Sequence, residues 1–402
     1  MGVIINIDEA LKGRSTYNIL REPLNQLIKD RQEAWEKENP IDFLYNRSSM
    51  DRFQVSFTSS IGFDKAFAET NDYAIGPIFN TAEGFSATYR TRTFQGSFII
   101  TQQVLEDEEF SKAADTAKQF TKRWHGDIVE YAMTAMQGAF GEEVTYGTLA
   151  DGKSRLKLMS ADTVDGDIHN TEKNPLFTNA HTIVKRDGMT ADDITAAYQS
   201  NCFYANIDIT GSSPDRISAL ADVINQVITI MENYKDDNNK YAGVDGAKTI
   251  VACNDAHLKA ALNTALSLDM FHQGDSMFPN PAYQRATTQF TPYLNNIECT
   301  AGGLGFFIVD KAYNAENHGP EFTERIPFTL DVTDTKRPSG IIYDGRQRFD
   351  INVASWRGIA YVYLGTPAGA TGEWDAVAHF TEITPVATIV KPVQVVGTVT
   401  TA

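Results

Sequence analysis

The acids, histidines and glycines that could do chemistry in this chain do not follow the spacing of a known catalytic motif. The closest approach to a phosphate-binding loop is GVDGAKT, residues 243–249. It lacks the G-x-x-x-x-G-K-[ST] spacing and leads into a strand pattern, so we interpret it as a turn. The glycines of 302–305 likewise precede a strand-like run instead of the helix that a dinucleotide-binding turn opens.

Two groups of side chains have the atom types that metal ions prefer. The first comprises Asp165, Asp167, His169 and His181, and the second is the run Asp236, Asp237, Asn238 and Asn239. Neither group matches a ligand-spacing template, so solvated loops are the favoured interpretation. We therefore expect no metal and no other cofactor.

The three cysteines, Cys202, Cys253 and Cys299, lie far apart and form no C-x-x-C pair. This usage indicates neither a zinc knuckle nor a disulfide framework, and it fits a reducing cytoplasm. The chain also lacks a G-x-S-x-G nucleophile elbow. One enzymatic alternative stays open, an α/β lobe between residues 200 and 310 with His257 or His272 as a base.

Composition limits the class of protein further. Of the 402 residues 42% are hydrophobic and 22% are charged, which is enough apolar material for one large or two medium cores. The formal net charge of −17 argues against a protein that wraps a nucleic-acid backbone. The first ten residues do not resemble a signal peptide, and no stretch approaches the roughly 20 apolar residues of a membrane span, so we expect a soluble, unsecreted protein.

The first half of the chain predicts an arm, a hairpin and a long helix. Residues 1–21 are expected to be irregular and 22–37 helical. Alternating apolar and polar residues across 53–100 predict a long two-stranded hairpin. Its middle, 66–87, has too few aliphatic residues to bury a core, so it needs a partner surface. Apolar residues at spacings of three and four then predict a helix over about 106–140.

The second half predicts a compact α/β lobe and a β-rich end. A helix is expected after Pro214, a strand at 249–253 and a helix at about 255–268 capped by Asn254. Strands are expected at 305–309, 326–332, 340–353 and 356–364, the last two as a hairpin that turns near 354–355. Prolines after residue 365 indicate an appendage or an edge strand.

Two segments support a family resemblance. YRTRTFQGSFIITQQ, residues 89–103, is similar to the return strand of an extended loop that runs into a spine helix, and DGRQRFDINV, residues 344–353, is similar to a late strand of a peripheral domain. Together with the order of elements, they make residues 18–365 resemble the Hong Kong 97-type fold of tailed-bacteriophage major capsid proteins. The fold expected is α+β, with an N-arm, an extended β-hairpin loop, a peripheral domain and an α/β axial domain.

The resemblance implies a domain division and a function. The division begins with an N-arm with a helix (1–52) and an extended loop (53–98). A two-part peripheral domain (99–199 with 331–366), an axial domain (200–330) and a C-terminal tail (367–402) make up the rest. The function expected is a major capsid protein, not an enzyme, that self-assembles through hexamers and pentamers into the icosahedral shell around the phage double-stranded DNA. The protein would then belong to the virion and assemble in the host cytoplasm. An encapsulin-like nanocompartment subunit is the alternative within the same fold.

The expected contacts with other molecules follow from the same resemblance. The extended loop would contact a neighbouring subunit through six apolar or aromatic side chains, Phe63, Tyr73, Ile78, Phe79, Phe85 and Tyr89. Only about fifty residues precede the hairpin, so we expect a separate scaffolding protein. The resemblance is also compatible with a portal protein, a decoration protein and packaged DNA that is held without sequence-specific contact. We expect no contact with a membrane. Lys65, Asn71 and Asn80 lie in the loop that some relatives crosslink, but they have no assigned role.

Overall fold

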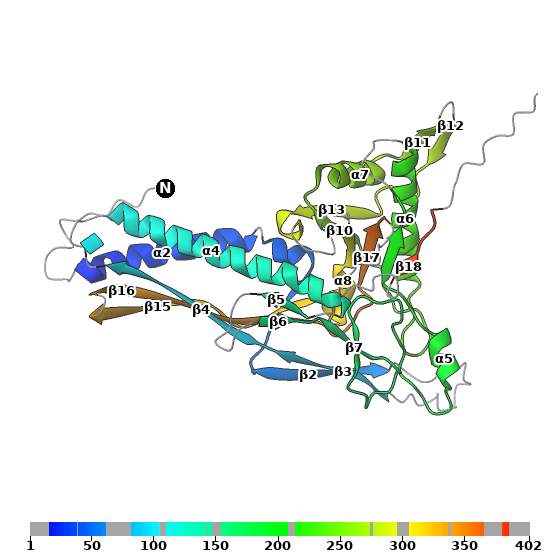
Figure 1. Ribbon diagram of the computed structural model, residues 1–402, viewed down its shortest axis with the longest axis horizontal. Coiled ribbons are helices and arrows are strands. Elements are labelled where there is room, and N and C mark those ends of the chain that lie inside the picture. Colours follow the sequence, from blue (N-terminus) through cyan, green and yellow to red (C-terminus); the bar gives the residue numbers. More distant parts are fainter. Residues whose placement is uncertain are drawn as a thin grey trace, which may run out of the picture.

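The computed structural model describes most of the chain. The described residues are 16–37, 39–61, 82–101, 103–104, 110–141, 143–146, 154–207, 214–273, 276–295, 305–336, 339–365 and 380–385. They form an elongated helix-on-sheet layer with a more compact lobe at one end (Figure 1).

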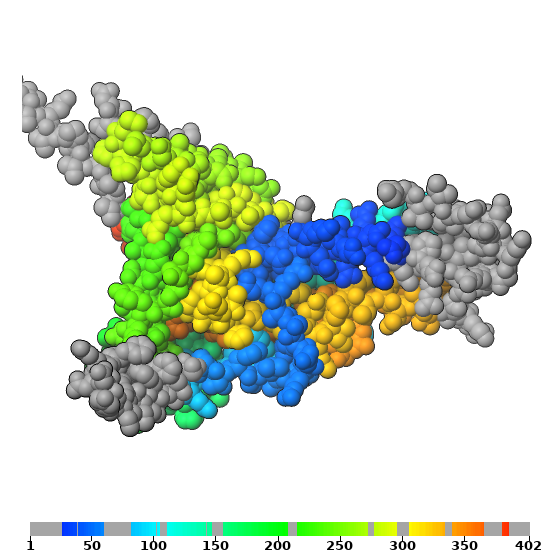
Figure 2. Space-filling view, turned by 180° about the vertical axis from the view of Figure 1, so that it is seen from behind, coloured from blue at the N-terminus to red at the C-terminus, as the bar shows by residue number. Residues whose placement is uncertain are grey.

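The elongated layer is built on a four-stranded sheet with the order β1-β15-β16-β4. The strands are β1 (Asn46–Ser49), β4 (Arg92–Thr101), β15 (Glu321–Lys336) and β16 (Ser339–Asn352). β15, β16 and β4 pair in antiparallel fashion, whereas β1 runs parallel to β15. In the space-filling view from behind, the blue segment that contains β1 lies beside the yellow to orange part of the chain that contains β15 (Figure 2).

Helix α4 (Phe110–Gln137) lies along one face of this sheet, and α2 (Thr16–Lys37) lies beside α4 (Figure 1). With 28 residues, α4 is about 42 Å long. Two glycines face each other where it crosses the sheet, because Gly345 of β16 pairs with Gly96 of β4. A Cβ on Gly96 would lie 3.2 Å from Trp124, and one on Gly345 would lie 3.0 Å from Phe120. The missing side chains therefore let the aromatic face of α4 approach the strands closely.

The lobe contains a six-stranded mixed sheet with the order β13-β10-β14-β17-β9-β18. Its central strands β10, β14 and β17 are almost fully buried, as strands covered on both faces must be. In chain order the strands are β9 (Cys202–Ala205), β10 (Lys248–Cys253), β13 (Ala286–Thr291), β14 (Phe306–Asp310), β17 (Ile359–Leu364) and β18 (Thr381–Glu382).

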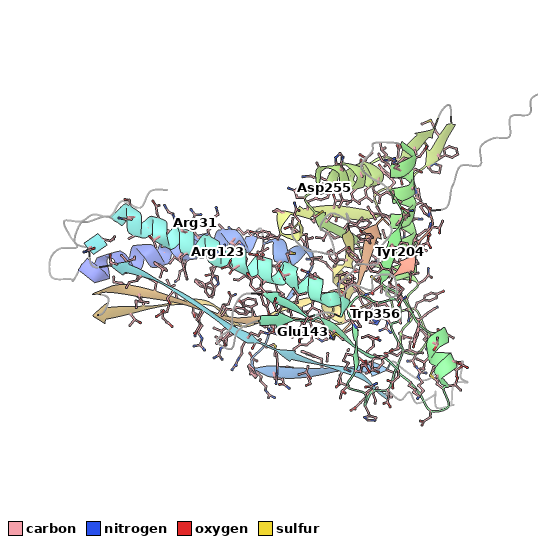
Figure 3. The ribbon with its side chains drawn as sticks, viewed as in Figure 1. Arg31, Arg123, Glu143, Tyr204, Asp255 and Trp356 are labelled. Atoms are coloured by element: carbon pink, nitrogen blue, oxygen red, sulfur yellow. The ribbon has the colours of Figure 1, made fainter. Side chains whose placement is uncertain are left out.

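Three helices belong to the same lobe: α6 (Pro214–Glu232), α7 (Ala256–Ser267) and α8 (Lys311–Glu316). Asp255, marked in Figure 3, caps α7 by accepting hydrogen bonds from the amides of His257 and Leu258. The prediction that Asn254 caps this helix is therefore wrong by one residue. Asp255 has the extended backbone of an N-cap and directs its carboxylate at the open end of the helix.

The remaining elements are short. They are η1 (Pro40–Phe43), η2 (Gly138–Phe140), β5 (Val144–Tyr146), β6 (Ser154–Leu156), β7 (Met159–Thr163), β8 (Lys173–Pro175), α5 (Ala191–Ala196), β11 (Met270–Gln273), β12 (Ser276–Pro279) and η3 (Pro292–Leu294). One large hydrophobic cluster runs from the inner half of α4 into the lobe, so the two parts share a core.

The structure confirms the α+β class and the long helix, and it corrects one strand pairing and the extent of one strand. β16 and β17 were expected to form a hairpin, but β16 pairs with β15 and β4, whereas β17 joins the sheet of the lobe. Residues 353–358 do not fold back as a turn but cross from one sheet to the other. The strand expected through residues 89–100 is also divided at Thr91, with β3 (Ala82–Arg90) in the hairpin and β4 in the long sheet.

Candidate assembly surfaces and the junction pocket

The projecting hairpin predicted from the sequence is present. β2 (Gln54–Ile61) pairs with β3 (Ala82–Arg90) in an antiparallel register from Gln54 opposite Arg90 to Ile61 opposite Ala82. These two strands form a sheet of their own, without a third strand among the described residues. Most β2 side chains with a described burial are exposed. A two-stranded ribbon of this kind is marginal in water unless another surface covers it.

The inner end of the hairpin is attached to the rest of the chain by aromatic contacts. The Phe57 ring lies 4.8 Å from the Tyr89 ring and 4.3 Å from the His318 ring, measured between centroids. The Tyr89 hydroxyl donates to the carbonyl oxygen of His318 at 3.3 Å. The Arg90 amide donates to Oδ1 of Asn352 at 3.3 Å. The hairpin is therefore held at its base.

The structure describes two of the six residues predicted to contact a neighbouring subunit. Phe85 and Tyr89 are 5% and 1% exposed and belong to a small core with Met50, Ala87 and Val184. Both therefore pack inside their own chain and hold the hairpin base. Phe63, Tyr73, Ile78 and Phe79 lie outside the described residues, as do Lys65, Asn71 and Asn80. Contact between these tip residues and a neighbour stays a prediction.

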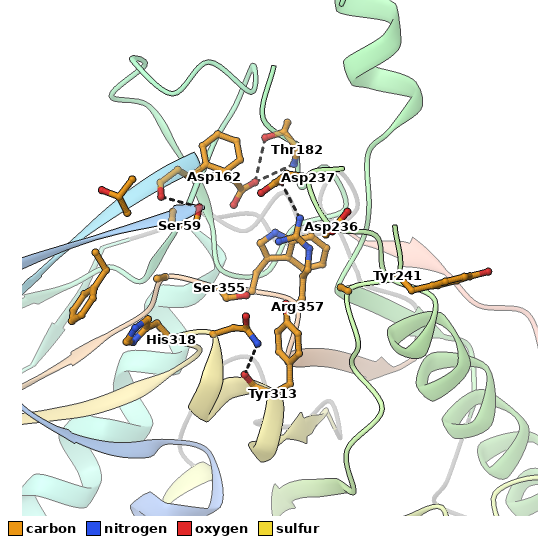
Figure 4. A pocket seen from close by; sticks show the side chains of 18 residues that line it. Ser59, Asp162, Thr182, Asp236, Asp237, Tyr241, Tyr313, His318, Ser355 and Arg357 are labelled. Carbon is orange, nitrogen blue, oxygen red and sulfur yellow. Dashed lines mark hydrogen bonds and ion pairs between the residues drawn. The ribbon is translucent and has the colours of Figure 1, made fainter. Parts of the chain in front are cut away.

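A pocket of about 360 Å³ opens where the hairpin base meets the lobe (Figure 4). Its charged lining residues include Asp162, Asp236, Asp237, His318 and Arg357. Each already has a partner in the chain. Oδ1 of Asp236 accepts from the amides of residues 238 and 240 at 2.8 Å, and Nδ1 of His318 lies 3.0 Å from a Glu321 carboxylate oxygen. The charged side chains of the pocket therefore hold segments of the chain together, and we interpret the pocket as a structural junction.

Asp162 is the centre of a buried polar network beside this pocket. Its carboxylate accepts from Nδ2 of Asn174 at 2.6 Å and from the Thr182 amide at 3.1 Å, and it lies 3.2 Å from Nδ1 of His181. Burial alone would raise the pKa of Asp162, but the attraction of His181 and the side-chain hydrogen bonds of His181, Ser160 and Asn174 outweigh it and lower the pKa to about 2. The carboxylate therefore stays ionised and acts as a structural acceptor.

Trp356 and Arg357 complete the joint. Trp356 lies where the elongated layer meets the lobe (Figure 3), and Arg357 packs over its ring with 5.0 Å from the guanidinium carbon to the ring centroid. The guanidinium donates to the Lys235 carbonyl at 2.9 Å and lies 3.3 Å from the Asp237 carboxylate. The carboxylate of Asp237 is thereby committed to an ion pair.

The sequence-predicted metal candidates do not converge. His181 is buried with Asp162, whereas Asp165 and Asp167 form turns with each other and with neighbouring amides at the surface. Within the described ranges no group of three or more His, Cys, Asp or Glu side chains is placed to hold a metal ion. The described cysteines, Cys202 and Cys253, are buried and unbonded to each other, and Cys299 lies outside the described residues.

The alternative of an enzymatic lobe receives no support from the described geometry. His257 is in the first turn of α7 and does not line the junction pocket, and His272 belongs to β11. The turn at residues 243–247 leads into β10 as expected, with Gly243 at φ 80°. No helix in the described ranges is long and apolar enough to cross a membrane.

Sequence reasoning did not identify the junction. Asp162, His181, Asn201 and Trp356 are spread over almost 200 positions, and only the fold brings them together. The one local signal was the adjacent pair Trp356 and Arg357, a large aromatic residue beside a cation that can pack on it.

Comparison with known proteins gave structural matches only. No family model and no curated protein matches the sequence. A solved structure described as Mycobacterium phage Patience matches with a TM-score of 0.45 and 11% identity, over 88% of this chain and 90% of that one. The capsid of Myoviridae phage XM1 matches with a TM-score of 0.42 and 12% identity, over 80% and 89%. The mature capsid of bacteriophage PhiM1 matches with a TM-score of 0.41 and 9% identity, over 81% and 89%.

Proposed function

We propose that this protein is the major capsid protein of a tailed bacteriophage, a structural subunit that self-assembles into the shell around packaged double-stranded DNA. The observation that carries the proposal is the projecting hairpin β2–β3, which is anchored at its base through Phe57 and Tyr89 and lies outside the sheets of its own chain. One face of the ribbon packs on its own chain through Phe85 and Tyr89, and the exposed side chains of β2 are left for a neighbouring molecule to cover.

The rest of the subunit supports the same assignment. A long helix on one face of a four-stranded sheet makes a thin, elongated body, and a lobe at its end gives it a wedge shape (Figure 1). Wedge-shaped subunits that repeat one heterologous contact close into rings. Rings of six subunits and rings of five subunits, the hexamers and pentamers, together close a shell. The acidic charge of −17 allows such a wall to enclose DNA without binding it tightly.

Further partners belong to the proposal. We expect homo-hexamers and pentamers of this chain, a separate scaffolding protein, a portal protein and a site of action in the phage head after assembly in the host cytoplasm. The domain division is part of the same proposal: an N-arm, an extended loop, a peripheral domain around α4 and an axial domain in the lobe.

Electron microscopy of the purified protein tests this function. The wild-type chain, expressed with the scaffolding protein of the same phage, should form closed shells. A variant with residues 62–81 replaced by a short Gly-Ser turn should keep the wild-type melting temperature and remain as free subunits or small oligomers, because the body retains its core. A wild-type protein that stays monomeric under these conditions would contradict the proposal. Shells that contain a folded cargo enzyme in place of DNA would support the encapsulin-like alternative.

A further inference from the structure

A groove of about 420 Å³ lies between α4, β4 and β5, and we call it the aromatic groove. Five of its ten lining residues are aromatic: Phe94, Trp124, Tyr131, Tyr146 and Phe349. Tyr131 and Phe349 are buried, whereas Phe94, Trp124 and Tyr146 are half-buried and leave part of their rings uncovered. Among the described strands β4 pairs only with β16, so its outer edge is open beside the groove. An apolar floor next to an open strand edge is suited to an extended peptide segment.

The rim of the aromatic groove is acidic. Its charged lining residues are Arg123, Asp127 and Glu130, with a net charge of 1 − 2 = −1. Arg123, labelled in Figure 3, pairs with Asp127 at 2.8 Å, and Glu130 has no cationic partner among the described residues. Burial, followed by the charges of Glu130 and Asp127, raises the pKa of Tyr146, so both carboxylates act on the groove lining. A nucleic-acid strand would be repelled by this rim, whereas an apolar segment with one cation would not.

The chain contains one segment with this chemistry outside the described residues. Four segments of more than ten residues lie there, and their charges differ. Residues 62–81 have a net charge of 1 − 3 = −2, residues 366–379 have 0 − 2 = −2, and residues 1–15 have two acids and two bases. Residues 386–402 have a single charged side chain, Lys391, and eleven of these seventeen residues are Val, Ile or Thr. This composition favours an extended strand with an apolar surface and one positive charge.

The groove of the same chain is out of reach of the first part of this segment. Phe380 stacks on Phe140, just past the C-terminal end of α4, with ring centroids 6.2 Å apart. The chain then continues along β18 into the lobe (Figure 1), whereas the groove lies about 20 Å back along α4, at Asp127. An extended chain spans at most about 3.5 Å per residue, so the four residues from Pro385 to Ile389 cover only about 14 Å. An occupant that begins near Ile389 therefore comes from a second molecule.

We propose that the aromatic groove binds residues 388–396 from the C-terminal segment of a second copy of this chain. The proposal rests on the proposed function, because assembly brings the two copies together. Ile389 and Val390 of the incoming segment cover the half-buried rings of the groove, and Lys391 pairs with Glu130 at the rim. The main chain of the segment lies along the open edge of β4.

Disulfide crosslinking in assembled shells tests the contact directly. After mild oxidation, the full-length variant Glu130→Cys with Lys391→Cys should run on a non-reducing gel as dimers and longer ladders, because the proposed pair brings the two positions together. The matched control, Lys29→Cys with Lys391→Cys, moves the first cysteine to an exposed position of α2 and should give at least about fivefold less crosslinked product. Each single substitution measures the background from the natural cysteines.

A pair of charge substitutions tests the apolar part of the contact. Ile389→Asp with Val390→Asp should reduce the yield of sedimentable shells at least about fivefold, because it places carboxylates against aromatic rings and an acidic rim. Thr398→Asp with Thr400→Asp adds the same charge outside residues 388–396 and should stay within about twofold of wild type. Neither variant should change the melting temperature of the free subunit, since the substituted residues bind another molecule.

The outcomes separate this proposal from the proposed function. Crosslinks within one chain, seen as a faster-running monomer, would overturn the second copy as the occupant. Equal crosslinking of the control at Lys29, or normal assembly of the variant at Ile389 and Val390, would overturn the groove as the binding site. Shells that form without the expected crosslinks would overturn this proposal alone, whereas a wild-type chain that forms no shells would contradict the proposed function as well.

Discussion

Trp356 lies flat against His181, with ring centroids 4.0 Å apart and ring planes 4° apart. Tyr234 of the lobe meets the same indole edge-on at 4.9 Å. Residues from the loop after β8, from the region beyond α6 and from the crossing between β16 and β17 are therefore packed around one buried side chain. This stack holds the elongated layer to the lobe.

We expect Trp356→Ala to reduce the free energy of unfolding by about 3 to 5 kcal/mol, because it leaves a large cavity between His181 and Tyr234. Urea unfolding of the unassembled subunit measures the change. Tyr241→Ala, which truncates an exposed aromatic residue at the rim of the same pocket and removes its cation–π contact with Lys235, is the control and should change the free energy by less than about 1 kcal/mol. Equal effects of the two substitutions would show that the stack does not hold the parts together.

The ionised state of Asp162 predicts a pH dependence of stability. Its pKa is lowered from 3.8 to about 2 in the folded protein, so its contribution is complete above about pH 4 and is lost as the pH falls toward 2. Asp162→Asn should therefore cost about 2 kcal/mol at pH 7, and the difference from wild type should shrink between pH 4 and pH 2. Urea titrations of both proteins across this range provide the measurement. A stability difference between the two proteins that does not change with pH would contradict an ionised Asp162 in the folded protein.

Lys248 and Asp310 form a buried ion pair, with Nζ 2.7 Å from Oδ2 and side chains 2% and 0% exposed. Lys248→Ala should cost about 3 to 5 kcal/mol, because it leaves the carboxylate buried without its cation. Lys248→Met combined with Asp310→Asn should cost much less, because neither charge remains and the asparagine can still cap α8 through the amide of Tyr313. The double variant is thus expected to melt above the single one, and the reverse order would refute this account.

His125 of α4 stacks on Trp35 of α2, with ring centroids 4.2 Å apart. Burial lowers the pKa of His125 to about 4, so the ring is neutral in the folded protein at pH 7. The unfolded chain binds a proton at this histidine more readily than the folded protein does. The folded protein is therefore most stable above about pH 6.5, and its free energy of unfolding decreases as the pH falls toward 4. Amide hydrogen exchange in α2 should therefore accelerate between pH 7 and pH 4.5, after correction for the intrinsic exchange rate. In His125→Phe, which keeps the stack without a titrating group, the acceleration should disappear.

The sequence predicted features that are encoded locally. The apolar face of α4, the turn before β10 and the projecting hairpin all come from periodicity or turn residues within one segment. The partner of β16 was not encoded in this way. β15 and β17 are both rich in aromatic and β-branched residues, and only tertiary packing selects β15. The junction around Asp162 was missed for the same reason, because its members are neighbours in space and not along the chain.

The single residue Thr91 between β3 and β4 has a mechanical consequence. Both strands continue from one buried point, with Thr91 only 3% exposed, so a tilt of β3 about Thr91 would turn it against the core around Phe85 and Tyr89. The nine residues of β3 span roughly 30 Å, so a tilt of about 5° at Thr91 displaces the far end of β3 by about 2 to 3 Å. In an assembly of the proposed kind, a small strain in the body of one molecule would thus reach its neighbour as a larger movement, and the same fold could fit sites of different curvature.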